Sequence, residues 1–243
     1  MNPMVAAPPA ASEGDRSANR VAHTYERLRE LIVSGRLAPG TRIIESDVSV
    51  RLQVIRTPVR SALQRLRQEG YVLALTPGRQ ARLTVSPLTR EDARELFGIL
   101  GEIESLGARW AAQLPVRRRE VLANELEELN RRLEAAAGGD AVDAGLVFQL
   151  HTRFHGYYME NVDAPRLLEL HRSIEPQAER YRRLYSHIFA QETHLSVREH
   201  EAIVRDIRSG EADAAQVSVQ VNWRNAADRL GRAIDVMGER GSW

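Results

Sequence analysis

The sequence contains no cysteine and no lysine among its 243 residues, so all 34 basic residues are arginine. Without cysteine, disulfide bonds and thiolate metal sites are excluded, and any metal must be held by histidine, carboxylate or amide oxygen. No apolar run is long enough to span a bilayer. The Ala- and Pro-rich segment 1–15 also lacks the basic and apolar regions of a signal peptide. We therefore expect a cytoplasmic protein in which residues 1–16 form a disordered tail.

Charge is distributed unevenly along the chain, although the formal net charge is only +1. Residues 1–86 hold 13 Arg and 7 acidic residues, whereas residues 87–243 hold 21 Arg and 26 acidic residues. A basic first third joined to an acidic remainder is typical of a DNA-binding domain attached to a domain that does not bind DNA. Chance clustering of charges on solvated surfaces would give the same count, so this asymmetry needs support from motifs.

The first third of the chain has the pattern of three helices followed by a β-hairpin. Helical spacing and turn residues predict helices over 21–35, 45–52 and 57–69. Two β-prone segments, 71–75 and 81–85, flank Thr76-Pro77-Gly78-Arg79, which has the composition of a hairpin tip. This order predicts a winged helix-turn-helix domain over residues 17–86.

Every segment after the break at 86–89 has helical periodicity. The predicted helices cover 89–113, 115–137, 142–161, 165–190, 196–209 and 212–237. We find no strand pattern after Val85. The sequence therefore predicts a mainly α protein whose second domain, 87–243, is an all-α bundle of six or seven helices.

Basic and hydroxyl side chains gather where a winged domain meets DNA. The start of a recognition helix reaches base edges and phosphates in the major groove, and the wing tip reaches the backbone or the minor groove. Arginine offers a bidentate fork to guanine, and threonine can donate to phosphate. The predicted DNA-contacting residues are Arg56, Thr57 and Arg60 on the third helix and Thr76, Gly78 and Arg79 on the wing.

Histidines form a second pattern in the helical domain. His151 and His155 are four residues apart, which places both imidazoles on one face of a helix, within reach of one metal ion. This spacing is equally compatible with a polar helix face or with core histidines bonded to neighbours. Thr152 and Arg153 stand where a zinc protease would need a glutamate, and the sequence contains neither a Gly-rich phosphate loop nor a nucleophile elbow.

Three segments of the first domain resemble the GntR family of bacterial regulators. They are VSGRLAPG (33–40), RTPVRSAL (56–63) and RLRQEGYV (65–72). The resemblance implies a DNA-contacting role for Arg56, Thr57 and Arg60. The chain departs from the family at Ile55, where Ser or Thr usually contributes a phosphate contact.

The region 88–234 is similar to the FCD ligand-binding domain of the FadR subfamily. The matching segments are IESLGAR (103–109), FH (154–155), NVDAPRLL (161–168), EHEAI (199–203) and NWRNA (222–226). Many such domains hold a divalent metal, often zinc, through one Asp and three His. The resemblance therefore implies a metal at His155 and His200, with His151 in the position of the Asp and Asn222 in that of the last His. Three neutral imidazoles would leave the charge of the ion uncompensated, which favours an anionic effector such as a carboxylate.

The resemblance also directs attention to residues that could line an effector pocket. Many FCD domains carry an Arg one turn before the Glu of the first long helix, and Leu100 stands at that position here. The predicted effector-binding residues are Leu100, Arg109, Tyr157 and Arg180.

Taken together, these observations predict a transcription repressor that binds a palindromic operator as a homodimer and responds to a small-molecule effector. Two alternatives stay open at the level of sequence. His151, His155 and His200 could belong to a metal-dependent hydrolase, although the DNA-binding third would then have no role. The metal could also be the signal itself, without an organic effector.

Overall fold

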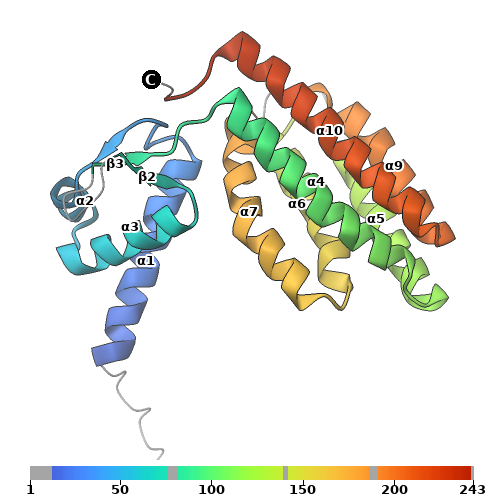
Figure 1. Cartoon of the computed structure of the whole chain (residues 1–243), viewed down its shortest axis with the longest axis horizontal. Coiled ribbons are helices and arrows are strands. Elements are labelled where there is room, and N and C mark those ends of the chain that lie inside the picture. Colours follow the sequence, from blue (N-terminus) through green and yellow to red (C-terminus); the bar gives the residue numbers. More distant parts are fainter. Residues whose placement is uncertain (1–12, 76–81, 139–141, 186–190, 242–243) are drawn as a thin grey trace, which may run out of the picture.

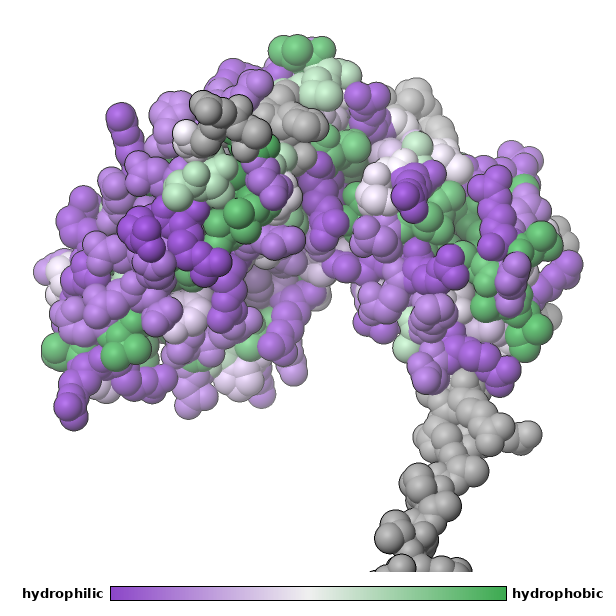
Figure 2. All heavy atoms as spheres, turned by 180° about the vertical axis from the view of Figure 1, so that it is seen from behind, coloured by the Kyte–Doolittle hydropathy of each residue, from purple (hydrophilic) through white to green (hydrophobic). Residues whose placement is uncertain are grey.

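The computed structural model describes residues 13–75, 82–138, 142–185 and 191–241. The chain folds into an N-terminal head and a helical body, which lie side by side and meet at one end (Figure 1). Seen from behind, the two lobes are separated by open space below their junction, and polar side chains cover most of this face (Figure 2). The mainly α fold predicted from the sequence is confirmed.

The head is a winged helix-turn-helix domain. Its elements are α1 (Glu13–Val33), β1 (Arg42–Ile43), α2 (Glu45–Leu52), α3 (Arg56–Gln68), β2 (Val72–Ala74) and β3 (Leu83–Val85). The three strands form an antiparallel sheet in the order β1-β3-β2. A small core of its own, which includes Leu28, Val59 and Leu66, holds the three helices together.

Two features of the head differ from the expectation. Helix α1 begins at Glu13, so residues 13–16, which we had assigned to the tail, are helical. The last proline of the N-terminal segment is Pro9, and no strong helix breaker other than Gly14 follows it before Gly35. Strand β1 was not predicted, because two residues are too short for any periodicity and exist as a strand only through pairing with Leu83 and Thr84.

The body consists of helices packed around one large core. The helices are α4 (Arg90–Ala112), α5 (Val116–Ala137), α6 (Ala144–Asn161), α7 (Pro165–Leu184), α9 (Thr193–Ser209) and α10 (Ala212–Met237). Thr89 caps α4 by accepting a hydrogen bond from the backbone N–H of Asp92. Helices α4 and α10 lie against each other along most of their length (Figure 1). No helix of the described residues is long and apolar enough to cross a membrane.

Helix α7 makes an ion pair and hydrogen bonds with the head, and the C-terminal segment also approaches it, where Gly241 lies against Pro39 and Gly40. The Arg29 guanidinium of α1 forms an ion pair of 2.7 Å with Glu179. The Tyr71 hydroxyl donates a hydrogen bond to the carbonyl oxygen of Pro176, and Arg180 donates one of 2.7 Å to the carbonyl oxygen of Ser86. The head is thus bound directly to one helix of the body and does not hang only from the linker at 86–89.

Candidate functional site

The DNA-binding residues predicted on the third helix lie on one exposed face of the head. Arg56, Thr57 and Arg60 are all exposed at the start of α3. The Arg60 guanidinium is held 3.1 Å from the Glu45 carboxylate of α2, so it is oriented without DNA. Ile55 precedes this helix and is 67% exposed. Its apolar side chain stands where the family usually has a Ser or Thr that contacts phosphate. The predicted wing residues Thr76, Gly78 and Arg79 lie outside the described residues.

Gln64 lies beside the predicted DNA contacts on α3 but was not among them. It is exposed one turn after Arg60, in the same i, i+4 series as Arg56. Its spacing from Arg56 and Arg60 was the signal that could have identified it. Gln can make a bidentate contact to adenine, so Gln64 extends the surface that α3 offers to the major groove.

The structure brings the three predicted histidine ligands together. His151 and His155 extend from α6, and His200 reaches them from α9. One ligand atom from each residue lies within 4.8 Å of the others. The ring centroids of His151 and His155 are 4.8 Å apart, and each is 5.1 Å from that of His200. This close approach of three imidazoles is the arrangement that a single transition-metal ion needs.

The hydrogen bonds around the cluster fix which nitrogen of each buried histidine faces the centre. The Nδ1 atom of His155 bonds to Glu104 at 2.7 Å, and that of His200 bonds to Asn130 Oδ1 at 3.0 Å. Since both acceptors are oxygen atoms, each Nδ1 carries the proton and each Nε2 keeps its lone pair. Both Nε2 atoms are buried and have no hydrogen-bond partner among the described residues. Their lone pairs are therefore available to a ligand.

Burial also keeps His151 and His200 neutral. Burial, reinforced by the neighbouring imidazoles, holds the pKa of His151 and of His200 well below the ordinary value. Neutral imidazole is the protonation state that binds metal. The donor set therefore fits a divalent transition metal.

Asn222 of α10 also points into this region. Its Nδ2 donates to Glu199 at 2.7 Å, so its Oδ1 is turned away from that carboxylate. This Oδ1 is buried and has no partner among the described residues. An amide oxygen held in this way can serve as a weak fourth ligand.

Glu104 of α4 organises the surroundings of the cluster. Its carboxylate is wholly buried and accepts hydrogen bonds from His155, Tyr158, Trp223 and His171. Burial alone would raise the pKa of Glu104, but His155 and His171 hold it well below its ordinary value. The ionised carboxylate thus orients His155, as carboxylates do behind metal-bound histidines.

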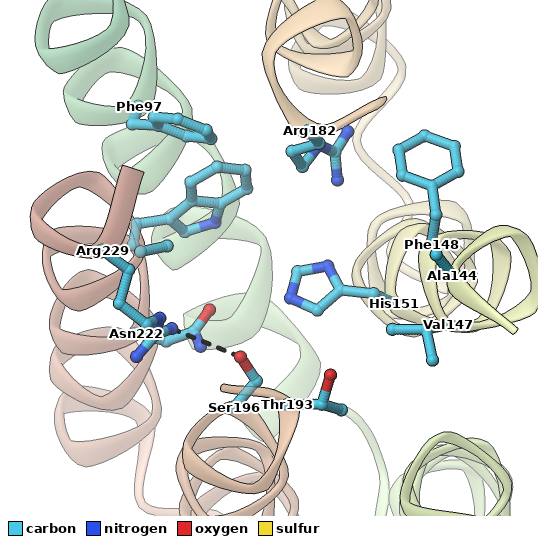
Figure 3. Close-up of a pocket in the computed structure, with 12 residues that line it drawn as sticks. Phe97, Ala144, Val147, Phe148, His151, Arg182, Thr193, Ser196, Asn222 and Arg229 are labelled. Atoms are coloured by element: carbon cyan, nitrogen blue, oxygen red, sulfur yellow. Dashed lines mark hydrogen bonds between the residues drawn. The ribbon is translucent and has the colours of Figure 1, made fainter. Parts of the chain in front are cut away.

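A small cavity, which we call the inner cavity, opens beside the histidines. It has a volume of about 30 Å³, and its wall includes His151, Asn222, Trp223, Arg182 and Arg229. Figure 3 shows His151 and Arg182 facing each other across it, with Asn222 on the α10 side. The cavity therefore brings two of the candidate ligands, His151 and Asn222, together with two buried guanidinium groups.

None of the four residues predicted to bind an effector lines the inner cavity. Leu100 is wholly buried in the core of the body, and Phe97 takes the position on α4 that faces the cavity. Arg109 forms an ion pair with Asp213 away from the cavity, and Arg180 bonds to the linker at Ser86.

Tyr157 lies under the guanidinium of Arg153, whose carbon is 4.9 Å from the ring centroid. Arg182 and Arg229 were the residues missed. Arg182 is two residues beyond Arg180 in the segment ERYRRL (179–184), in which four of the six residues are charged. The sequence does not show which of these charged side chains turns inward.

Comparison with known proteins agrees with this architecture. Residues 20–79 match the family described as "Bacterial regulatory proteins, gntR family", and residues 95–222 match the FCD domain. The chain is 20% identical to the HTH-type transcriptional regulator YdhC of Bacillus subtilis, over 87% of this chain and 91% of that protein. It is 27% identical to the HTH-type transcriptional repressor RspR of Escherichia coli, over 79% and 80% of the two chains.

Solved structures show the same fold. A putative GntR transcriptional regulator from Rhodococcus sp. RHA1 superposes with a TM-score of 0.64 at 23% identity, covering 87% of this chain and 97% of that one. Escherichia coli McbR/YncC superposes with the same TM-score at 19% identity, covering 88% and 97%. With a gntR-type head and an FCD body both matched, the chain belongs to the GntR family of bacterial regulators with an FCD domain and is a transcriptional regulator, not an enzyme.

Proposed function

We propose that this regulator is a repressor whose affinity for its operator is set by a small carboxylate bound beside a metal ion in the body. The observation that carries the proposal is the set of unpartnered, inward-facing donor atoms: Nε2 of His155, Nε2 of His200 and Oδ1 of Asn222. Buried polar atoms without a partner cost free energy, so their convergence beside a third histidine calls for a ligand. Repression is inferred from the relative RspR, which is named a repressor.

His151, His155, His200 and Asn222 would hold the metal, and zinc suits their nitrogen-rich set best. When bound, such an ion supplies a positive charge and an open coordination position for an anion. The chain itself adds to this positive field, because Arg182 and Arg229 line the same cavity and no carboxylate of the described residues does. The glutamates nearest to the cluster, Glu104 and Glu199, are already engaged by other donors. An anion, and specifically a carboxylate, is therefore the ligand that the cavity favours.

Helix α7 gives the body a physical connection to DNA binding. The same helix that provides Arg182 to the cavity also contacts the head through Pro176, Glu179 and Arg180. A ligand that moves α7 would change how the head is held against the body. Two heads must lie one helical turn of DNA apart to bind a palindrome, so such a change would alter operator affinity in a homodimer.

The test measures operator binding by the full-length protein, using a duplex selected by the protein from a random pool. We expect that zinc together with a panel of small carboxylates, beginning with acetate and glutarate, weakens binding by about tenfold or more. His155→Ala and His200→Ala should lose both zinc and this response, whereas the exposed His194→Ala should keep both.

The outcomes separate the alternatives. A response to zinc alone, unchanged by any carboxylate, would show that the metal is the signal. Unchanged operator affinity in the His155→Ala and His200→Ala proteins under all conditions would refute the proposal, because the cluster would then have no regulatory role.

A further inference from the structure

Arg182 lies in the wall between the inner cavity and a second, larger pocket. This second pocket, which we call the outer pocket, has a volume of about 450 Å³ and lies between α6 and α7. Arg182 and Phe148 line both spaces. The Arg182 guanidinium lies over the Phe148 ring, with its carbon 5.5 Å from the ring centroid. These two side chains therefore stand between the two spaces, and His155 of the cluster lines the outer pocket directly.

The two arginines of the inner cavity differ in how fully they are bound. Arg229 is held by both carboxylate oxygens of Glu199, at 2.8 and 3.0 Å, and by Ser196. Arg182 is equally buried but is held through one nitrogen only, by Glu175. Its Nε is buried and has no partner among the described residues. The same holds for Nε of Arg229, but Arg229 is bonded through both of its terminal nitrogens and Arg182 through only one.

The partner of Arg182 is easier to displace than Arg182 itself. The Glu175 side chain retains 20% of its accessible surface, against 7% for Arg182. Glu175 belongs to the same helix two turns earlier and lines the outer pocket. Its carboxylate occupies the arginine as a carboxylate ligand would, so it acts as a ligand supplied by the chain itself.

We propose that Glu175 is an internal competitor for the effector, and that the effector is an elongated dicarboxylate which displaces it. One carboxylate of the effector binds Arg182 on the cavity side, and the rest of the molecule lies in the outer pocket. This inference rests on the proposed function, because it adds the shape of the effector and its route to the same site.

Size and charge support an elongated ligand. The inner cavity has room for a few water molecules or one small anionic group, since about 10–15 Å³ of such space holds one water. The outer pocket is more than ten times larger, which leaves room for the rest of a ligand. The outer pocket is lined by three arginines and three glutamates, and the glutamates are bonded to other side chains: Glu160 to Arg153, Glu175 to Arg182 and Glu104 to histidines. Arg172 lines the same pocket and has no ion-pair partner among the described residues. A second carboxylate would therefore meet a cation there.

Glu175 is adjacent in sequence to a residue of α7 that contacts the head. Pro176 follows it directly, and the carbonyl oxygen of Pro176 accepts the hydrogen bond from Tyr71. Pro176 lies inside α7 and lacks an N–H, so the helix is missing one of its own hydrogen bonds at this point. The segment that responds to the ligand is thus the segment that holds the head.

The experiment measures binding of glutarate and acetate to the full-length protein by calorimetry, with zinc and after removal of metal by EDTA. The test variant is Glu175→Gln, which keeps the shape of the side chain and removes its charge. The matched control is Glu128→Gln, because Glu128 also pairs with an arginine of its own helix, Arg131, far from the site. Near-ultraviolet circular dichroism verifies that each variant is folded.

We expect Glu175→Gln to bind glutarate about fivefold more tightly than the unmodified protein, because the competing ion pair is gone. Glu128→Gln should bind like the unmodified protein, Arg182→Lys should bind more weakly, and glutarate should bind more tightly than acetate. Equal or weaker binding of glutarate by a folded Glu175→Gln protein overturns the inference, as does preference for acetate. The proposed function has a separate readout: it loses its basis if removal of zinc leaves carboxylate binding to the unmodified protein unchanged.

Discussion

The hydroxyl of Tyr71 lies 2.9 Å from the carbonyl oxygen of Pro176 and donates a hydrogen bond to it across the boundary between head and body. Tyr71 follows the recognition helix α3 and is wholly buried, and it also accepts a hydrogen bond from Arg29. Pro176 belongs to the helix that carries Arg182 into the inner cavity. This bond therefore connects the helix of the proposed effector site to a residue that closely follows the recognition helix.

Removal of this bond should loosen the head. We expect Tyr71→Phe to lower the free energy of unfolding by about 1–2 kcal/mol, because the carbonyl oxygen of Pro176 and the Arg29 guanidinium lose a partner. Hydrogen exchange should accelerate in the segment 86–89. The control is Tyr185→Phe, which removes a hydroxyl bonded to Gly238 at the far end of α7. If Tyr185→Phe accelerates exchange in the linker as much as Tyr71→Phe does, the Tyr71 bond does not fix the head.

The recognition helix makes a prediction about salt dependence. Arg56→Ala and Arg60→Ala should each weaken binding to a selected operator, by about 1–3 kcal/mol where the arginine reads a base. An arginine that contacts phosphate should instead lower the slope of log affinity against log salt by about 1. Arg117→Ala, an exposed arginine of α5, serves as the control. Unchanged affinity and slope in both head variants would show that α3 does not enter the groove.

Asn222 should limit the affinity for zinc. We expect Asn222→His to bind zinc about tenfold more tightly or better, since imidazole is a stronger ligand than a neutral amide oxygen. The Nδ1–H of the new ring can take over the bond to Glu199. Asn225→His is the matched control, because Asn225 bonds to the same carboxylate from the next turn. Competition against a zinc-binding dye measures the zinc affinity of both variants. An equal gain in zinc affinity in the two variants would mean that Asn222 is not beside the ion.

Glu104 should matter for both stability and metal binding. Glu104→Gln replaces one acceptor oxygen by an N–H₂ group that meets donors, so we expect a loss of about 3–5 kcal/mol in the free energy of unfolding. Zinc affinity should fall by about 10- to 100-fold, because His155 loses the partner that orients it. Glu102→Gln, an exposed change on the same helix, should do neither. A stable Glu104→Gln protein with normal zinc affinity would contradict this role.

The sequence by itself determined the elements and the two-part plan of this protein. Proline, glycine and capping residues mark where each helix begins and ends, and the spacing of its apolar residues shows which side is buried. These local signals placed α2 and α10 at their observed bounds. They also put Arg56 and Arg60 on one exposed face, and His151 beside His155, because a spacing of four is decided within a single helix.

Tertiary structure alone decided how residues of different helices meet. Spacing could not show that His200 and Asn222 reach the pair on α6; family resemblance indicated it, and the packing of α9 and α10 brings the side chains there. Periodicity likewise could not choose between Arg180 and Arg182. The two side chains point about 200° apart around α7, so they face different neighbours. Arg180 faces the linker to the head, and Arg182 faces the inner cavity.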